Sequence, residues 1–99
     1  MSGDVEVAVL TAAFTARSDH EADLAAVLAR YVVLTRGEPG CRNVDLLVSA
    51  TESGQFLVVE KWDSMEALQA HAAAPHMSAY GAKTKELIAS RVIHILAPA

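Results

Sequence analysis

Two-sided hydrophobicity in the strand-like segments is the feature that most restricts how this chain folds. The segment from Val5 to Phe14 reads Val-Glu-Val-Ala-Val-Leu-Thr-Ala-Ala-Phe, and alternate side chains of a strand point to opposite faces. Val5, Val7 and Val9 therefore share one face, whereas Ala8, Leu10, Ala12 and Phe14 share the other. Such a strand needs an apolar neighbour on both sides, so one covering layer of helices does not suffice.

Two helical segments separate the expected strands. Ser18, with a glutamate three residues later, has the spacing of a capping box for a first helix that ends near Gly37. Asp63, also followed by a glutamate after three residues, is expected to cap a second helix, which Pro75 interrupts before it resumes. Period-two hydrophobicity predicts strands at 5–14, 41–50, 55–62 and 91–96.

The resulting order, βαββαβ, predicts a ferredoxin-like α+β fold with an antiparallel four-stranded sheet and the helices on one face. The 99 residues suffice for one core, so we expect a single domain spanning residues 1–99. The uncovered face of this sheet is also apolar, because the strands at 55–62 and 91–96 carry hydrophobic residues on both sides. A second copy of the chain is the simplest cover, so we expect a homodimer.

Composition excludes several classes of function. The formal net charge of −4, with scattered basic residues, argues against a nucleic-acid partner. Charges interrupt every apolar stretch, which argues against a membrane span. The first residues lack the pattern of a secretory signal, and Cys41 is the single cysteine, so we expect a cytoplasmic protein. No glycine-rich phosphate or dinucleotide motif is present.

The segment 38–80 resembles the antibiotic biosynthesis monooxygenase family. The resemblance is carried by Glu38-Pro39-Gly40-Cys41, Glu60-Lys61-Trp62, the helix opening Ser64 to Leu68, His71, and Pro75-His76. It implies a dimeric α/β barrel with a pocket between sheet and helices. It also implies oxygenation of quinols or polyphenolic aromatics by molecular oxygen without a cofactor. Haem degradation is disfavoured, because haem-degrading relatives use an asparagine on the first strand, whereas the middle of that strand has only Thr11 as a polar residue here.

Three residues are candidates for acid–base catalysis. His71 shares the sheet-facing side of the second helix, and an imidazole can accept a phenolic proton near neutral pH. His76 follows Pro75 at the restart of the helix and is a second candidate. Glu60 lies on an apolar strand face, where a carboxylate needs a partner such as a histidine or Arg91. Each of these side chains also has a purely structural explanation.

Three further residues are candidates for binding a substrate, and they too admit structural roles. Trp62 is expected near the pocket from the resemblance and could stack on a planar ring. Tyr80 could orient a substrate hydroxyl, and Asn43 could donate to a substrate oxygen. No metal site is expected, because His71 and His76 are five residues apart rather than the four that align imidazoles on one helix.

The resemblance over residues 38–80 implies that the function is that of a cofactor-independent monooxygenase. Two alternatives remain open from the sequence. The same pocket could isomerise or bind a small oxygenated metabolite, or the dimer could be a non-enzymatic stress-related protein in which the histidines and Trp62 belong to the core.

Overall fold

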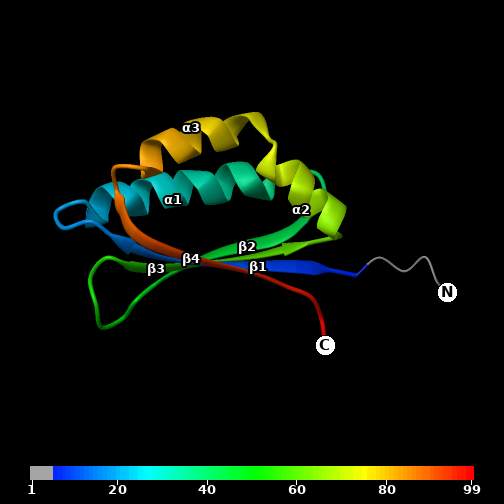
Figure 1. Ribbon diagram of the computed structural model, residues 1–99, viewed down its shortest axis with the longest axis horizontal. Coiled ribbons are helices and arrows are strands. Elements are labelled where there is room, and N and C mark those ends of the chain that lie inside the picture. Colours follow the sequence, from blue (N-terminus) through cyan, green and yellow to red (C-terminus); the bar gives the residue numbers. More distant parts are fainter. Residues whose placement is uncertain (1–5) are drawn as a thin grey trace.

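The two-sided apolar segment forms an interior strand of the sheet. In the computed structural model, which describes residues 6–99, β1 (Ala8–Ala16) lies between β3 and β4 in an antiparallel sheet of order β2-β3-β1-β4 (Figure 1). The predicted start of this strand at Val5 lies outside the described residues. The remaining elements are α1 (Glu21–Arg36), β2 (Cys41–Val48), β3 (Gln55–Trp62), α2 (Met65–Ala72), α3 (Pro75–Thr84) and β4 (Ile88–Leu96).

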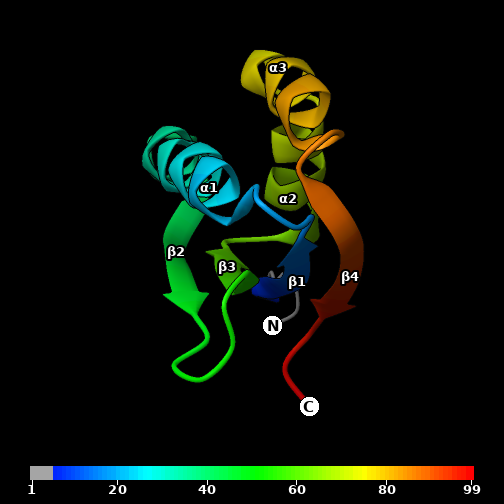
Figure 2. The same cartoon turned by 90° about the vertical axis from the view of Figure 1, so that its left-hand side faces the viewer.

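This arrangement confirms the ferredoxin-like α+β prediction, with all helices on one face of the sheet. Viewed end-on in Figure 2, α1 covers the side of β2 and β3, whereas α2 and α3 stand toward β4. The predicted second helix is two helices, because Pro75 begins α3 at its first turn and cannot donate the N–H that would continue α2. The last strand begins at Ile88 rather than Arg91.

Both predicted helix caps are wrong in detail. Helix α1 begins after His20, which makes no side-chain cap bond, and not after Ser18. Helix α2 is capped by Ser64, whose hydroxyl accepts the Ala67 N–H at 3.0 Å. Asp63 does not take that place, because its carboxylate accepts from Nε of Arg42 at 2.6 Å and its backbone N–H is donated to the Gly40 carbonyl at 2.8 Å.

The hydrophobic core lies between α1 and the sheet. Leu24 and Leu28 of α1 are fully buried, and they belong to one cluster with Val44 of β2 and Val58 of β3. A smaller cluster combines Ala8, Trp62 and Leu68 beneath α2. Helices α1 and α2 therefore pack on the same face of the sheet, each through its own cluster.

Strand β4 is the least covered part of the sheet. Register with β1 places Ile93 and Ile95 on the helix-facing side and Val92 and Leu96 on the open side. All four remain about half exposed, between 47% and 55%. No helix within residues 6–99 has the length and hydrophobicity to cross a membrane.

Candidate functional site

A buried carboxylate on β3 is the centre of the site. Glu60 is only 1% exposed and faces the helices. Its Oε1 accepts the indole N–H of Trp62 at 2.9 Å, and its Oε2 accepts the hydroxyl of Tyr31 from α1. Sequence reasoning expected a histidine or Arg91 as the partner. The closest hydrogen bonds come instead from Tyr31 and Trp62, while His71 Nε2 lies 3.8 Å away.

His71 connects this carboxylate to a second one. Its Nε2 lies 2.9 Å from the Tyr31 hydroxyl oxygen, and its Nδ1 lies 2.7 Å from Oε2 of Glu38. The imidazole ring lies against Trp62, with centroids 4.7 Å apart and the planes tilted by 32°. The side chain is 4% exposed, so contacts on both nitrogens and one ring face fix its position.

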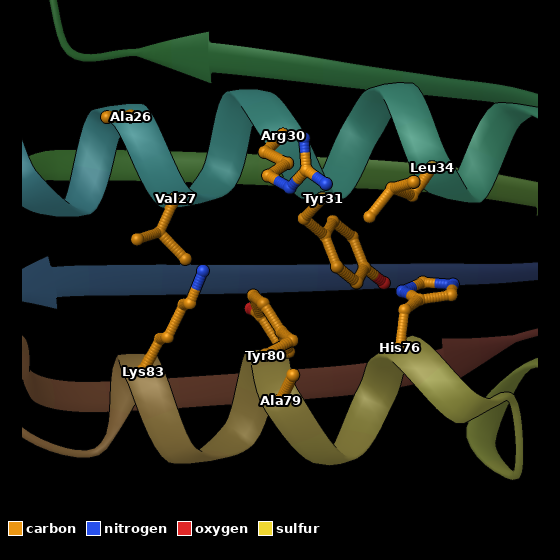
Figure 3. Close-up of a pocket in the computed structure, with 9 residues that line it drawn as sticks. All are labelled: Ala26, Val27, Arg30, Tyr31, Leu34, His76, Ala79, Tyr80 and Lys83. Carbon is orange, nitrogen blue, oxygen red and sulfur yellow. The ribbon is translucent and has the colours of Figure 1, made fainter.

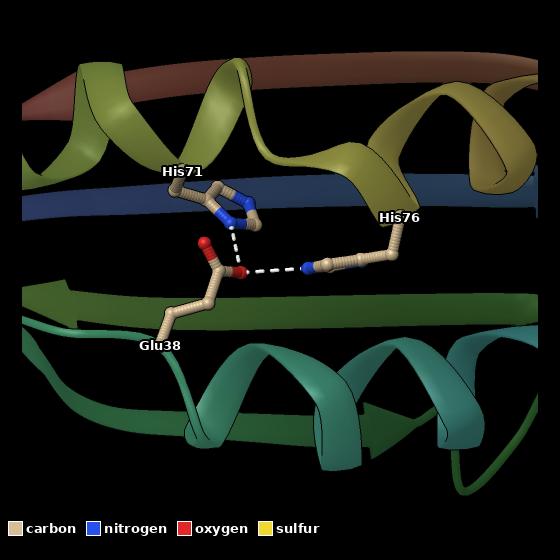
Figure 4. Close-up of side chains that lie close together, drawn as sticks. All are labelled: Glu38, His71 and His76. Atoms are coloured by element: carbon tan, nitrogen blue, oxygen red, sulfur yellow. Dashed lines mark hydrogen bonds and ion pairs between the residues drawn. The ribbon is translucent and has the colours of Figure 1, made fainter.

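His76 completes the chain of contacts from the first turn of α3. Its Nε2 lies 2.8 Å from the same Glu38 oxygen that contacts His71 (Figure 4). Pro75 turns the backbone between α2 and α3, so two histidines that are not aligned on one helix still converge on one carboxylate. Spacing within a single helix could not reveal this convergence.

Gly40 allows the loop that carries Glu38 to approach α2. Its φ of +81° is in the left-handed region, which favours glycine. A Cβ at this position would lie 2.6 Å from the Cβ of Ala67, closer than side-chain carbons tolerate. The Glu-Pro-Gly turn therefore does more than reverse the chain, because it brings the Glu38 carboxylate to the two histidines.

The hydrogen bonds form one chain, Trp62–Glu60–Tyr31–His71–Glu38. Two arrangements of the same number of protons satisfy every hydrogen bond in this chain. In one, a protonated Glu60 donates to Tyr31 and Tyr31 donates to a neutral His71. In the other, Tyr31 donates to ionised Glu60, and His71 donates from both nitrogens. The chain can thus move a proton between Glu60 and His71 without changing its heavy-atom contacts.

Among the residues that the structure describes, histidine is the only basic residue type that pairs with Glu38 and Glu60. Within residues 6–99, neither Glu38 nor Glu60 forms an ion pair with a lysine or an arginine. Buried charge requires compensation, which here must come from an imidazole, a proton or a bound ion.

Both tyrosines of the site stay in the neutral hydroxyl form. Burial, followed by the charge of Glu60, raises the pKa of Tyr31 far above its ordinary value. Burial is also the main cause that raises the pKa of Tyr80 to about 12, against the opposing effect of Arg91. Near neutral pH, each hydroxyl can donate a hydrogen bond.

Two cavities meet at these tyrosines. The first, of about 380 Å³, lies between the sheet and the helices. Its wall includes Leu10, Phe14, Tyr31, Glu60, Met65, Leu68, Gln69, His71, Met77, Tyr80, Arg91, Ile93 and Ile95. The second, of about 400 Å³, lies between α1 and α3 and is bordered by Arg30, Tyr31, His76, Tyr80 and Lys83, among others (Figure 3). The Tyr31 and Tyr80 rings, 4.5 Å apart, border both.

The structure brings most of the candidate residues together. Glu60, His71 and Tyr80 line the sheet-side cavity, and His76 borders the other one. Trp62 is completely buried behind Glu60 and lines neither cavity. Its predicted stacking on a substrate therefore has no support from this geometry.

Asn43 is not brought to the site. It pairs in register with Lys61, it is exposed, and its amide donates to Asp45 at 3.0 Å. Substrate binding by Asn43 stays a prediction without geometric support. Two residues of the site were not among the predicted candidates. Glu38 was named only as part of the segment that carries the family resemblance, and Tyr31 was not singled out.

Comparisons with known proteins agree with this architecture. The family model described as antibiotic biosynthesis monooxygenase matches residues 8–83. Rv0793 of Mycobacterium tuberculosis, named as a candidate monooxygenase, is 39% identical over 93 residues, covering 93% of this chain and 90% of the relative. Its solved structure superposes with a TM-score of 0.87 at 34% identity, covering 94% and 95% of the two chains.

Two further solved structures share the fold. PA3566 of Pseudomonas aeruginosa superposes with a TM-score of 0.90 at 26% identity, covering 97% of each chain. SnoaB of Streptomyces nogalater, described as a cofactor-independent oxygenase, superposes with a TM-score of 0.86 at 16% identity, covering 96% and 95%. The second likeness shows the fold alone.

Proposed function

This chain belongs to the antibiotic biosynthesis monooxygenase family, and from that premise we propose that it oxidises a quinol or polyphenolic aromatic with molecular oxygen and without a cofactor. One observation carries the proposal: a histidine on the wall of a mostly apolar cavity is held between a tyrosine and a carboxylate. Such an imidazole can accept a proton and stabilise the charge it acquires. SnoaB indicates that the fold is compatible with cofactor-independent oxygenation.

The first step is deprotonation of the substrate. A phenolic hydroxyl in the sheet-side cavity would give its proton to Nε2 of His71, with Tyr31 as the relay between the substrate and the imidazole. Glu38, at Nδ1, stabilises the imidazolium that results. The raised pKa of Tyr80 keeps its hydroxyl available as a donor to a second substrate oxygen.

Oxygenation then follows from the electron-rich anion itself. The anion passes one electron to O₂, and the substrate radical and superoxide combine to a peroxide anion at a ring carbon that carries a hydrogen. The peroxide takes up the proton held on His71 and becomes a hydroperoxide. Loss of the hydrogen of that carbon as a proton, with cleavage of the O–O bond, then leaves one oxygen atom as a carbonyl and releases the other as water. The leucine, isoleucine and methionine side chains of the cavity wall would limit the access of bulk water to these intermediates.

The proposal includes a homodimer that forms through the open face of the sheet. Val92 and Leu96 of β4 are half exposed on the open sheet face, and Leu47 of β2 is 51% exposed there. A two-fold partner would bury the same apolar patch on both copies. Sedimentation equilibrium should give twice the chain mass, and Leu96→Lys should shift the equilibrium toward monomer.

Oxygen consumption tests the activity. Purified protein, stripped of metal and flavin, should consume O₂ in the presence of quinols or polyphenols. With ¹⁸O₂, one labelled oxygen atom should be incorporated into the product. His71→Gln should lower kcat by about 10²–10⁴-fold, the usual contribution of a general base. The exposed His20→Gln should leave kcat unchanged. Absence of uptake above background across the phenol and quinol panel would refute the proposal.

A further inference from the structure

Glu38, His71 and His76 form the densest cluster of potential metal ligands in the described part of the chain. One carboxylate oxygen and two imidazole nitrogens lie within 4.8 Å of one another, each from a different segment (Figure 4). We propose that these three residues bind a divalent transition-metal ion of the Zn²⁺ class. This ion site goes beyond the proposed oxygenation, which requires no metal.

The ligand set suits such an ion. Imidazole nitrogens and a carboxylate oxygen are the usual protein ligands of Zn²⁺, and three of them leave one position open to water. Tetrahedral ligands about 2.0–2.1 Å from the ion lie about 3.3 Å from each other. The Glu38 oxygen now lies 2.7 Å from His71 and 2.8 Å from His76, so modest side-chain rotations would admit the ion.

A second layer of contacts already prepares His71 as a ligand. Metal-binding histidines usually donate their other ring N–H to an oxygen, which fixes the ring and the tautomer. Here Nε2 faces the Tyr31 hydroxyl at 2.9 Å, and Tyr31 in turn donates to Glu60. With the proton on Nε2, the lone pair of Nδ1 points toward Glu38, where the ion would lie.

Charge favours occupation as well. Glu38 and Glu60 are both largely buried, with side chains 15% and 1% exposed, and they pair only with histidines in the part of the chain described. A divalent cation would offset both negative charges at once. By contrast, His20 pairs with Asp23 on the exposed surface of α1 with no third ligand, and it therefore provides a matched control.

Ion binding would also affect the proposed reaction. An ion on Nδ1 holds the proton on Nε2 in place, so His71 could no longer accept one from a substrate. This consequence alone rests on the proposed function, and it predicts that Zn²⁺ inhibits oxygenation at one equivalent per chain.

Metal binding is measured without substrate, so its outcome is independent of the activity. Chelator-treated full-length protein should bind one Zn²⁺ per chain in isothermal titration, with a Kd of about 10 μM or tighter. Co²⁺ should give the intense visible absorption of a four-coordinate site. His76→Gln, at a side chain that is only partly buried, should weaken Zn²⁺ binding by about 100-fold or more, and Tyr31→Phe by about 10–100-fold.

Two variants separate this site from other zinc-binding groups. His20→Gln should bind Zn²⁺ as the parent protein does, and so should Cys41→Ser, which removes the single thiol. The proposal is overturned if the parent binds no more tightly than His76→Gln, or if Cys41→Ser loses the ion instead. Circular dichroism of His76→Gln confirms that a loss of binding does not reflect a loss of fold.

Discussion

The hydrogen bond between Tyr31 and Glu60 offers a direct test of how the buried polar chain contributes to stability. Tyr31→Phe removes one oxygen atom and almost no volume, so packing against Tyr80 and His71 should persist. It leaves one oxygen of Glu60, which is 1% exposed, without its donor, and it also removes the hydroxyl that lies 2.9 Å from Nε2 of His71. A hydrogen bond to a charged group contributes about 1.5–3 kcal/mol, and an unsatisfied buried acceptor costs a similar amount.

We therefore expect Tyr31→Phe to lower the free energy of unfolding by about 2–3 kcal/mol. Urea denaturation followed by circular dichroism, at one fixed protein concentration, measures this value, and the m-value should not change. Tyr80→Phe is the matched control, because the Tyr80 hydroxyl makes no hydrogen bond with another residue of 6–99. The control should cost less than about 1 kcal/mol.

A double-mutant cycle isolates the interaction itself. Glu60→Leu removes the carboxylate that accepts the Tyr31 hydroxyl, and the double variant with Tyr31→Phe removes both partners. The coupling energy should be about 1.5–3 kcal/mol. A coupling below about 0.5 kcal/mol, or a Tyr31→Phe cost equal to that of Tyr80→Phe, would refute the reasoning.

Three other perturbations test the surroundings of the site. Gly40→Ala should lower the free energy of unfolding by at least about 2 kcal/mol, because it combines a left-handed φ with a clash against Ala67. Gly81→Ala, which has open space around its Cβ, should not destabilise the protein. Equal denaturation midpoints for the two glycine variants would contradict this. Ser64→Ala should cost about 1 kcal/mol through loss of the α2 cap, while the exposed Ser78→Ala in α3 should be neutral or stabilising. Burial raises the pKa of Cys41, so less thiolate is present at pH 8 in the native protein than in the unfolded protein. Native protein should therefore react with iodoacetamide more slowly than urea-unfolded protein, and a faster native reaction would show that the thiol is activated instead.

Period-two hydrophobicity was sufficient to predict the sheet. The bounds of β3 agree with the predicted segment 55–62, because its alternation is regular and charged or loop residues flank it. Helix starts were harder, since several capping residues compete locally. Asp63 and Ser64 are both good N-caps, but Asp63 is engaged by Gly40 and Arg42, which lie more than twenty residues earlier in the sequence.

The candidate site was predicted only in part, for a related reason. Glu60 and His71 stood out because a charge and an imidazole occupied faces that should be apolar. Tyr31 and Glu38 had no such mark, because a tyrosine on a helix face and a glutamate before Pro-Gly are common in structural roles. Their importance depends on contacts across 29 and 33 residues of sequence, which local patterns do not contain.

The cavity wall has a consequence for how proteins of this kind diversify. The hydrogen-bonded side chains Glu60, Tyr31, His71 and Glu38 come from β3, α1, α2 and the loop before β2, whereas Arg91, Ile93 and Ile95 of the cavity wall come from β4. Substitutions in β4 can therefore reshape the space offered to a ligand while the acid–base residues keep their contacts. Mutation of one edge strand can therefore change the shape of the cavity without touching the hydrogen-bonded chain.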